Sequence, residues 1–140
     1  MARRPVFLDT SYLVALSNLD DPHHDRSKKL DERLLRQGVP IVSHWGIMLE
    51  IADGFARLSR RSKGMDLLQR MMTEERYRIE PISSSLFNEA LDRYCTRADK
   101  EWSLTDCISF VLMEQLKLKE ALTADNHFRQ AEFRALLLEA

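Results

Sequence analysis

The sequence predicts an α/β domain with a mostly parallel central sheet and helices on both faces. Short apolar runs of strand length alternate with segments of helical periodicity, and this alternation is typical of right-handed β-α-β units. Two of the apolar runs end in an acid, at Asp9 and at Asp125. Because ligands bind outside the carboxyl ends of the strands in such sheets, we expect both acids to face the binding crevice.

Length and composition predict one globular domain over residues 1–140. The 140 residues, 44% of them hydrophobic and 31% charged, suffice for one core and are too few for two ordinary domains. The formal charge of −1 excludes a strongly basic field over the whole molecule, so a nucleic-acid partner has to be held by a local patch. The sequence contains no apolar run of membrane-span or signal-peptide type. We therefore expect a cytoplasmic protein without a membrane partner.

The N-terminal half is predicted to form, in order, a strand at 5–9, a turn at 10–11, a helix at 12–16, a helix at 23–37, a strand at 40–43 and a helix at 45–58. Short apolar runs identify the strands. Pro22 and Gly38 mark the start and the end of the second helix, because proline suits a first helical turn and glycine suits a C-cap. Apolar residues at helical spacing from Trp45 to Leu58 identify the third helix.

The C-terminal half is predicted to form a helix at 65–76, a weak strand at 78–82, a helix starting at 83 or 84, a helix starting at 103, a strand at 121–124, a short helix at 127–128 and a last strand at 133–138. Pro81 places the weak strand near a sheet edge, because proline lacks the N–H that a ladder needs. Ser103 can cap the helix that follows it, so Asp106 falls in the first turn of that helix.

Four acids are candidates for a single site: Asp9, Glu50, Asp106 and Asp125. Each alone has a simpler explanation as a helix cap or a solvent-exposed charge. Asp9, Glu50 and Asp106 are embedded in apolar sequence, however, and lone carboxylates are seldom buried without a partner. A divalent cation would supply that partner. Oxygen ligands without a cysteine cluster or closely spaced histidines indicate Mg²⁺ or Mn²⁺, and such a site activates water for attack on a phosphate ester.

Four segments carry a family resemblance: Phe7-Leu8-Asp9-Thr10-Ser11, Glu50 on its helix, residues 102–110 around Asp106, and residues 122–128 around Asp125. Together they resemble the PIN domain, the fold of VapC-type toxins. Their order and spacing match across nearly the whole chain. The resemblance implies a three-layer α/β/α fold and a metal-dependent ribonuclease, often a homodimer and often silenced by a small antitoxin.

The resemblance also implies roles for single residues. By position, Asp9, Glu50, Asp106 and Asp125 are the metal-binding and catalytic acids. Thr10 or Ser11 matches the hydroxyl residue that supports the first acid. Asp53, one turn from Glu50, is an alternative for the second acid.

We therefore expect Mg²⁺ or Mn²⁺, held by these acids, to activate a water molecule for attack on an RNA phosphodiester. Cleavage is expected to leave a 5′-phosphate and a 3′-hydroxyl. Binding of the RNA backbone requires positively charged side chains. A group of basic residues that follows the Glu50 helix is either an RNA-binding patch or a solvated turn: Arg57, Arg60, Arg61 and Lys63.

Other functional classes fit less well. A haloacid dehalogenase-like phosphatase needs a second acid two residues after Asp9, where this chain has Ser11. A receiver domain needs paired acids near the first strand and a lysine after the last strand, and the sequence has neither. The alternatives to the toxin are a PIN-fold RNA-binding or interaction module without catalysis, and an RNA-processing nuclease without an antitoxin.

Overall fold

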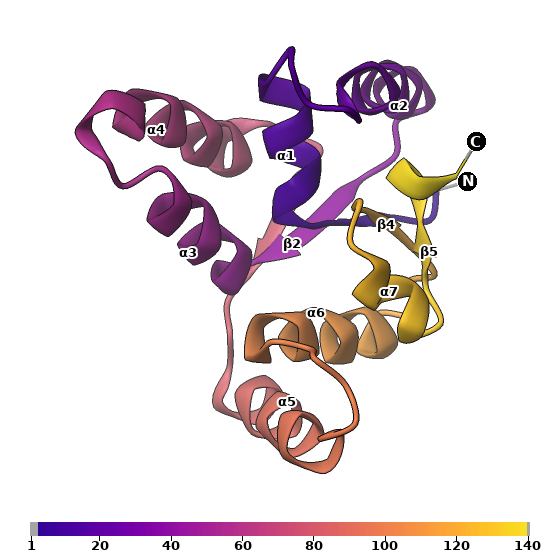
Figure 1. The fold of residues 1–140 in the computed structure, drawn as a ribbon. Coiled ribbons are helices and arrows are strands. Elements are labelled where there is room, and N and C mark those ends of the chain that lie inside the picture. Colours follow the sequence, from indigo (N-terminus) through magenta and orange to yellow (C-terminus); the bar gives the residue numbers. More distant parts are fainter. Residues whose placement is uncertain (1–2, 140) are drawn as a thin grey trace.

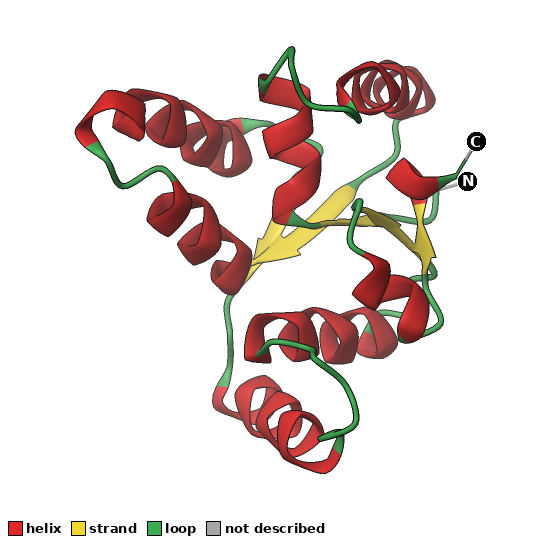
Figure 2. Cartoon of the chain, in the orientation of Figure 1, coloured by secondary structure: helices red, strands yellow, loops and turns green. Residues whose placement is uncertain are grey.

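A single five-stranded sheet forms the centre of the computed structural model, which describes residues 3–139 (Figure 2). The strands are, in chain order, β1 (Val6–Leu8), β2 (Ile41–His44), β3 (Tyr77–Glu80), β4 (Glu120–Leu122) and β5 (Arg134–Ala135). Their order across the sheet is β3-β2-β1-β4-β5, and every neighbouring pair is parallel. The predicted α/β class with a parallel sheet is therefore confirmed.

Helices cover both faces of this sheet. They are α1 (Thr10–Ser17), α2 (His24–Gln37), α3 (Trp45–Gly54), α4 (Leu58–Thr73), α5 (Ser84–Thr96), α6 (Leu104–Gln115), α7 (Asn126–Gln130) and a 3₁₀ helix, η1 (Leu136–Leu138). In Figure 1, α1 and α2 lie on one side of the sheet, whereas α5, α6 and α7 lie on the other. The result is the expected three-layer α/β/α arrangement. Within residues 3–139, no helix is both long enough and apolar enough to cross a membrane.

The central strand, β1, explains why two acids come together. Its residues are fully buried, as expected for a strand that is covered on both faces of a parallel sheet. Leu8 of β1 pairs with Leu122 of β4. Because the two strands are parallel and in this register, Asp9 and Thr123 follow them side by side at the carboxyl edge of the sheet, with Asp125 two residues further on.

Two helix ends agree with their sequence signals. Gly38 ends α2 in the left-handed conformation, with φ of 64°, which a residue with a side chain adopts only at a cost. Ser103 begins α6 with a capping box: its Oγ accepts from the Asp106 N–H over 2.9 Å, and the Asp106 carboxylate accepts from the Ser103 N–H over 3.1 Å.

The boundaries of several predicted elements were wrong. The helix predicted to run to Leu58 ends at Gly54, and Leu58 instead begins α4. The helix predicted at 65–76 is this same α4, which starts at Leu58 and ends at Thr73. Its start was missed because its polar first turns carry no apolar periodicity. The strand predicted at 133–138 is limited to Arg134–Ala135, and η1 follows it. The weak strand near Pro81 lies at the sheet edge, as expected.

An aromatic cluster joins the elements that carry three of the acids. The Phe128 ring on α7 stacks on Phe7 of β1 with ring centroids 6.0 Å apart, and it meets Phe110 of α6 edge-on at 5.0 Å. All three rings are fully buried. Since Phe7, Phe110 and Phe128 lie within four residues of Asp9, Asp106 and Asp125, this packing places the three acids relative to one another.

Candidate active site

The four predicted acids line one pocket of about 420 Å³ at the carboxyl edge of the sheet. Asp9 lies between β1 and α1, Glu50 on α3, Asp106 in the first turn of α6, and Asp125 directly before α7. Each acid therefore comes from a different part of the chain. The rest of the lining is formed by Thr10, Ser11, Val14, Asp21, His23 and Ala124.

Asp9 is the most enclosed of these carboxylates, with 7% of its surface exposed. Its Oδ2 accepts hydrogen bonds from Thr123 Oγ1 over 2.7 Å and from Ser11 Oγ over 3.1 Å. Although Asp9 is at the N-cap position of α1, its side chain makes no capping bond. The simple explanation of Asp9 as a helix cap is therefore wrong.

Glu50 is tied to the start of the same helix. Thr10 donates from Oγ1 to Glu50 Oε1 over 2.7 Å. The two hydroxyl residues at the start of α1 thus contact two different acids, Ser11 contacting Asp9 and Thr10 contacting Glu50. Asp53, the alternative for the second acid, is exposed and does not line the pocket.

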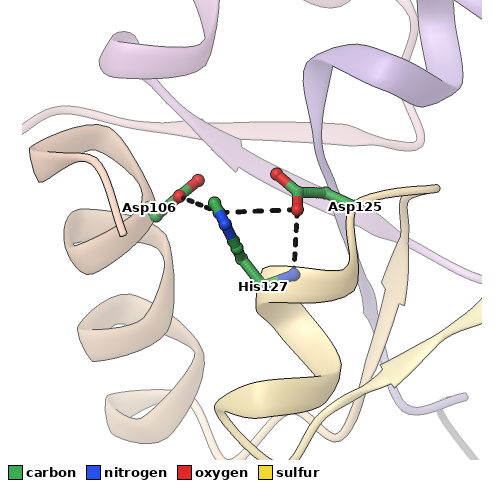
Figure 3. Close-up of side chains that lie close together, drawn as sticks. All are labelled: Asp106, Asp125 and His127. Carbon is green, nitrogen blue, oxygen red and sulfur yellow. Dashed lines mark hydrogen bonds and ion pairs between the residues drawn. The ribbon is translucent and has the colours of Figure 1, made fainter. Parts of the chain in front are cut away.

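Asp106 and Asp125 lie on either side of the His127 ring (Figure 3). The ring Nδ1 lies 2.9 Å from Asp106 Oδ2 and 3.5 Å from Asp125 Oδ1. The His127 backbone N–H also donates to Asp125 Oδ1 over 2.8 Å, which caps α7. One ligand atom from each of these three residues falls within 4.8 Å of the others.

All four carboxylates share one bonding pattern. In each, one oxygen is anchored, and within residues 3–139 the other accepts no hydrogen bond from the protein. The anchored oxygens belong to Asp9 (Oδ2), Glu50 (Oε1), Asp106 (Oδ2) and Asp125 (Oδ1). The protein thus restrains each carboxylate and leaves one oxygen available to a ligand.

Burial, followed by the crowding of negative charge, raises the pKa values of two acids, Asp9 and Glu50. Burial raises the pKa of Asp9 to about 6, the Thr123 hydrogen bond opposes this rise, and the negative charges of Glu50, Asp125 and Asp106 add to it. The pKa of Glu50 is also raised, first by burial and then by Asp106 and Asp125, against the Thr10 hydrogen bond. Ionising all four acids together is therefore unfavourable without a positive charge.

A hard divalent cation fits this donor set. Mg²⁺ and Mn²⁺ prefer carboxylate oxygens, and each acid offers an oxygen that accepts no hydrogen bond from the residues that the structure describes. A cation would also remove the repulsion that raises the pKa of Asp9. The part of the chain that the structure describes places no cysteine in the pocket, which agrees with an oxygen-rich site.

The predicted RNA-binding cations lie outside the pocket. All of them are exposed, at the connection between α3 and α4 and in the first turns of α4: Arg57, Arg60, Arg61 and Lys63. Arg61 donates to the carbonyl of Ala56, and the Arg60 guanidinium lies 4.9 Å from the centroid of the Phe55 ring. Their role in binding RNA stays a prediction.

Sequence reasoning missed several residues of the site. Asp21 and His23 line the pocket from the α1–α2 connection, where the sequence indicated only a helix start. The contact between His127 and Asp106 depends on the packing of α7 against α6, which no local pattern reveals. A signal did exist for Thr123, because a hydroxyl residue at the end of a strand next to β1 is placed to meet Asp9.

Comparisons with known proteins agree with this geometry. The family model of the PIN domain matches residues 6–134. The 23S rRNA-specific endonuclease VapC20 of Mycobacterium tuberculosis is 25% identical over 130 residues, which cover 91% of this chain and 95% of the relative. Its crystal structure, described as a Sarcin-Ricin loop cleaving toxin, superposes with a TM-score of 0.79 at 22% identity and the same coverage.

A second solved structure, FitAcB from Neisseria gonorrhoeae, superposes with a TM-score of 0.63. It is 19% identical and the match covers 93% of this chain and 95% of that chain. Both superpositions concern the fold. The family match extends over nearly the whole sequence and includes the strands and helices that carry all four acids. This chain belongs to the PIN domain family.

Proposed function

We propose that this protein is a metal-dependent ribonuclease that hydrolyses RNA phosphodiester bonds. The observation that carries the proposal is the set of four anchored carboxylates around one pocket, each with one oxygen that has no hydrogen-bond donor among residues 3–139. Membership of the PIN family and the relation to a 23S rRNA-specific endonuclease support RNA as the substrate.

In this proposal Asp9, Glu50, Asp106 and Asp125 hold Mg²⁺ or Mn²⁺. The ion, when bound, supplies a water of lowered pKa and offsets the negative charge of the phosphate. Asp9 has to be ionised to take part, and its pKa of about 6 means that it is largely charged at neutral pH even before an ion binds.

The surrounding residues orient the acids. Thr123, Ser11 and Thr10 each donate to an oxygen of Asp9 or Glu50, and so hold these carboxylates in one rotamer. Attack of water in line with the leaving oxygen of the phosphodiester breaks the bond between phosphorus and the 3′-oxygen. The products are a 5′-phosphate and a 3′-hydroxyl.

We further infer that the protein is the toxin of a type II toxin–antitoxin pair in the cytoplasm, with a cognate antitoxin and a second copy of the chain as partners. The relative VapC20 is described as a toxin. Exposed apolar side chains on α2 and α4 support protein contacts there: Leu35, Met65 and Met72 are each more than 60% exposed.

The proposal is tested by incubating purified protein with ribosomal RNA and with a pool of structured RNAs, in Mn²⁺ or in chelator. Asp9→Asn and Asp106→Asn remove a charge and keep the shape, and Asp66→Asn on the exposed side of α4 is the matched control. We expect metal-dependent cutting by the wild type and the control, and its loss in both site variants. A wild type that binds RNA but never cuts it would replace the nuclease with a non-catalytic binding module.

A further inference from the structure

We propose that His44 is a positioning residue that ties the helix carrying Glu50 to the helix carrying Asp106, and so sets the separation of these two acids. The inference rests on the proposed metal site. It concerns a side chain outside the acid pocket, at the end of β2 and the N-cap of α3.

The hydrogen bonds of His44 define its tautomer. The ring is completely buried, and its Nδ1 accepts from the Gly46 backbone N–H over 2.9 Å. The ring proton is therefore on Nε2, which donates to Ser109 Oγ over 2.8 Å. Ser109 in turn donates to the carbonyl of Thr105 over 3.1 Å. Both ring nitrogens and the Ser109 hydroxyl are thus satisfied inside the protein.

Each end of this chain of hydrogen bonds lies close to an acid. Gly46 is in the first turn of α3, four residues before Glu50. Thr105 directly precedes Asp106, and Ser109 lies three residues after it on α6. The ring therefore links the two helices about one turn away from each acid. Since His44 is the N-cap of α3, a shift of one helix relative to the other would stretch the bond between His44 Nε2 and Ser109 Oγ.

The residues around His44 leave space for its ring. A β-carbon on Gly46 would lie 2.7 Å from His44 Cε1 and 2.9 Å from Nδ1, so α3 can begin against the imidazole only because residue 46 is glycine. The Phe7 ring of β1 lies against the imidazole, with centroids 5.7 Å apart. Burial also lowers the pKa of His44 to about 4, so the ring is neutral at physiological pH and keeps the donor and acceptor roles described above.

Two substitutions separate positioning from simple packing. Ser109→Ala removes the α6 partner and leaves the bond between His44 and Gly46 in place. His44→Asn keeps an oxygen that can cap α3, but the shorter side chain does not reach Ser109. We expect each variant to bind Mn²⁺ about 10-fold more weakly, as is usual when a group that orients metal ligands is lost. The double variant should be little weaker than either single one.

The measurement is Mn²⁺ affinity by calorimetry at neutral pH, together with thermal unfolding. Leu34→Ala is the control, because Leu34 is buried on α2, which carries none of the four acids. This control should lower the unfolding temperature and leave Mn²⁺ affinity unchanged.

The outcomes distinguish the inference from the function on which it rests. Ser109→Ala and His44→Asn variants that lose stability but bind Mn²⁺ as tightly as the wild type would reduce His44 to a packing residue and overturn the inference. A wild type that binds no Mn²⁺ would overturn the metal site itself, and with it the role of His44.

Discussion

Thr123 Oγ1 donates a 2.7 Å hydrogen bond to Asp9 Oδ2 from a position 114 residues later in the chain. The bond exists because β1 and β4 are adjacent parallel strands that end in register, Leu8 opposite Leu122. It favours the charged form of Asp9 and so opposes the effect of burial on the pKa of that acid. The central acid of the pocket therefore depends on a neighbouring strand for part of its acidity.

Thr123→Val removes this donor and keeps the branched shape, so we expect the pKa of Asp9 to rise above its present value of about 6. The pH at which Mn²⁺ binding is half-maximal should move up by about one pH unit. Calorimetric titrations with Mn²⁺ between pH 5 and 8 measure this midpoint. Thr73→Val, at the exposed end of α4, is the control. An unchanged pH dependence of binding would contradict the role of Thr123.

Asp9→Asn should stabilise the metal-free protein at high pH. The pKa of Asp9 is about 6 in the folded protein and near its ordinary 3.8 in the unfolded chain. The folded state therefore holds this proton more tightly, and stability is lost as the pH rises through 6. At pH 8 the variant should gain up to about 3 kcal/mol in the free energy of unfolding. Urea unfolding in chelator at pH 8 and at pH 4 tests this; a variant less stable at both would refute it.

His44 should have the opposite pH dependence. Its pKa is about 4 in the folded protein, below the ordinary 6.5, so the unfolded chain binds the proton more tightly. This contribution to stability is complete above pH 6.5 and is lost as the pH falls towards 4. In the wild type, this loss of stability at low pH counteracts the gain in stability that comes from protonation of Asp9 between about pH 6 and pH 4. In Asp9→Asn it should emerge as a loss of about 3 kcal/mol, and adding His44→Asn should remove that pH dependence.

Asp31 on α2 should matter for stability and not for the metal. It accepts hydrogen bonds from Tyr12 over 2.9 Å and from Arg76 over 2.7 Å, and it pairs with Arg70 over 3.3 Å. Asp31→Asn leaves two partly buried guanidinium groups without this charge, so we expect the free energy of unfolding to fall by about 2 kcal/mol. Chemical unfolding and Mn²⁺ calorimetry on the same sample measure both properties. Weakened Mn²⁺ binding would show that this network also shapes the pocket.

The cations after α3 should affect RNA binding rather than the chemical step. Neutralising three of them, as Arg57→Gln, Arg60→Gln and Lys63→Gln, should raise KM and make the salt dependence of KM less steep, with kcat unchanged. Cleavage rates at several salt concentrations give both constants. The control neutralises three exposed cations of α2: Lys28, Lys29 and Arg36. An equal effect of the two triple variants would mean that RNA contacts no defined patch here.

Local sequence signals predicted much of this fold. The glycine at the end of α2 and the serine that caps α6 were both identified, because each acts on backbone groups within a few residues. The connection between α3 and α4 was missed, since buried Phe55 continues the apolar spacing of α3 past its actual end at Gly54. A periodicity argument cannot detect a helix break when the next apolar residue still faces the core.

The sequence indicated the acids of the candidate site but not the residues that hold those acids in place. Apolar surroundings distinguished Asp9 and Asp106 from surface acids, because buried carboxylates are rare. The partners of these acids, such as Thr123 and His127, are ordinary residues by type and gain their role only from strand register and helix packing. The same holds for His44, whose hydrogen bond to Ser109 connects elements far apart in the sequence.

The position of β1 in the middle of the sheet has a consequence for the synthesis of the protein. β1 pairs on one side with β2 and on the other with β4, which comes much later in the sequence. Until β4 has emerged, a nascent chain lacks both Thr123 and Asp125, and one edge of β1 has no partner. The pocket with its four acids is therefore complete only after the chain has been translated as far as Asp125.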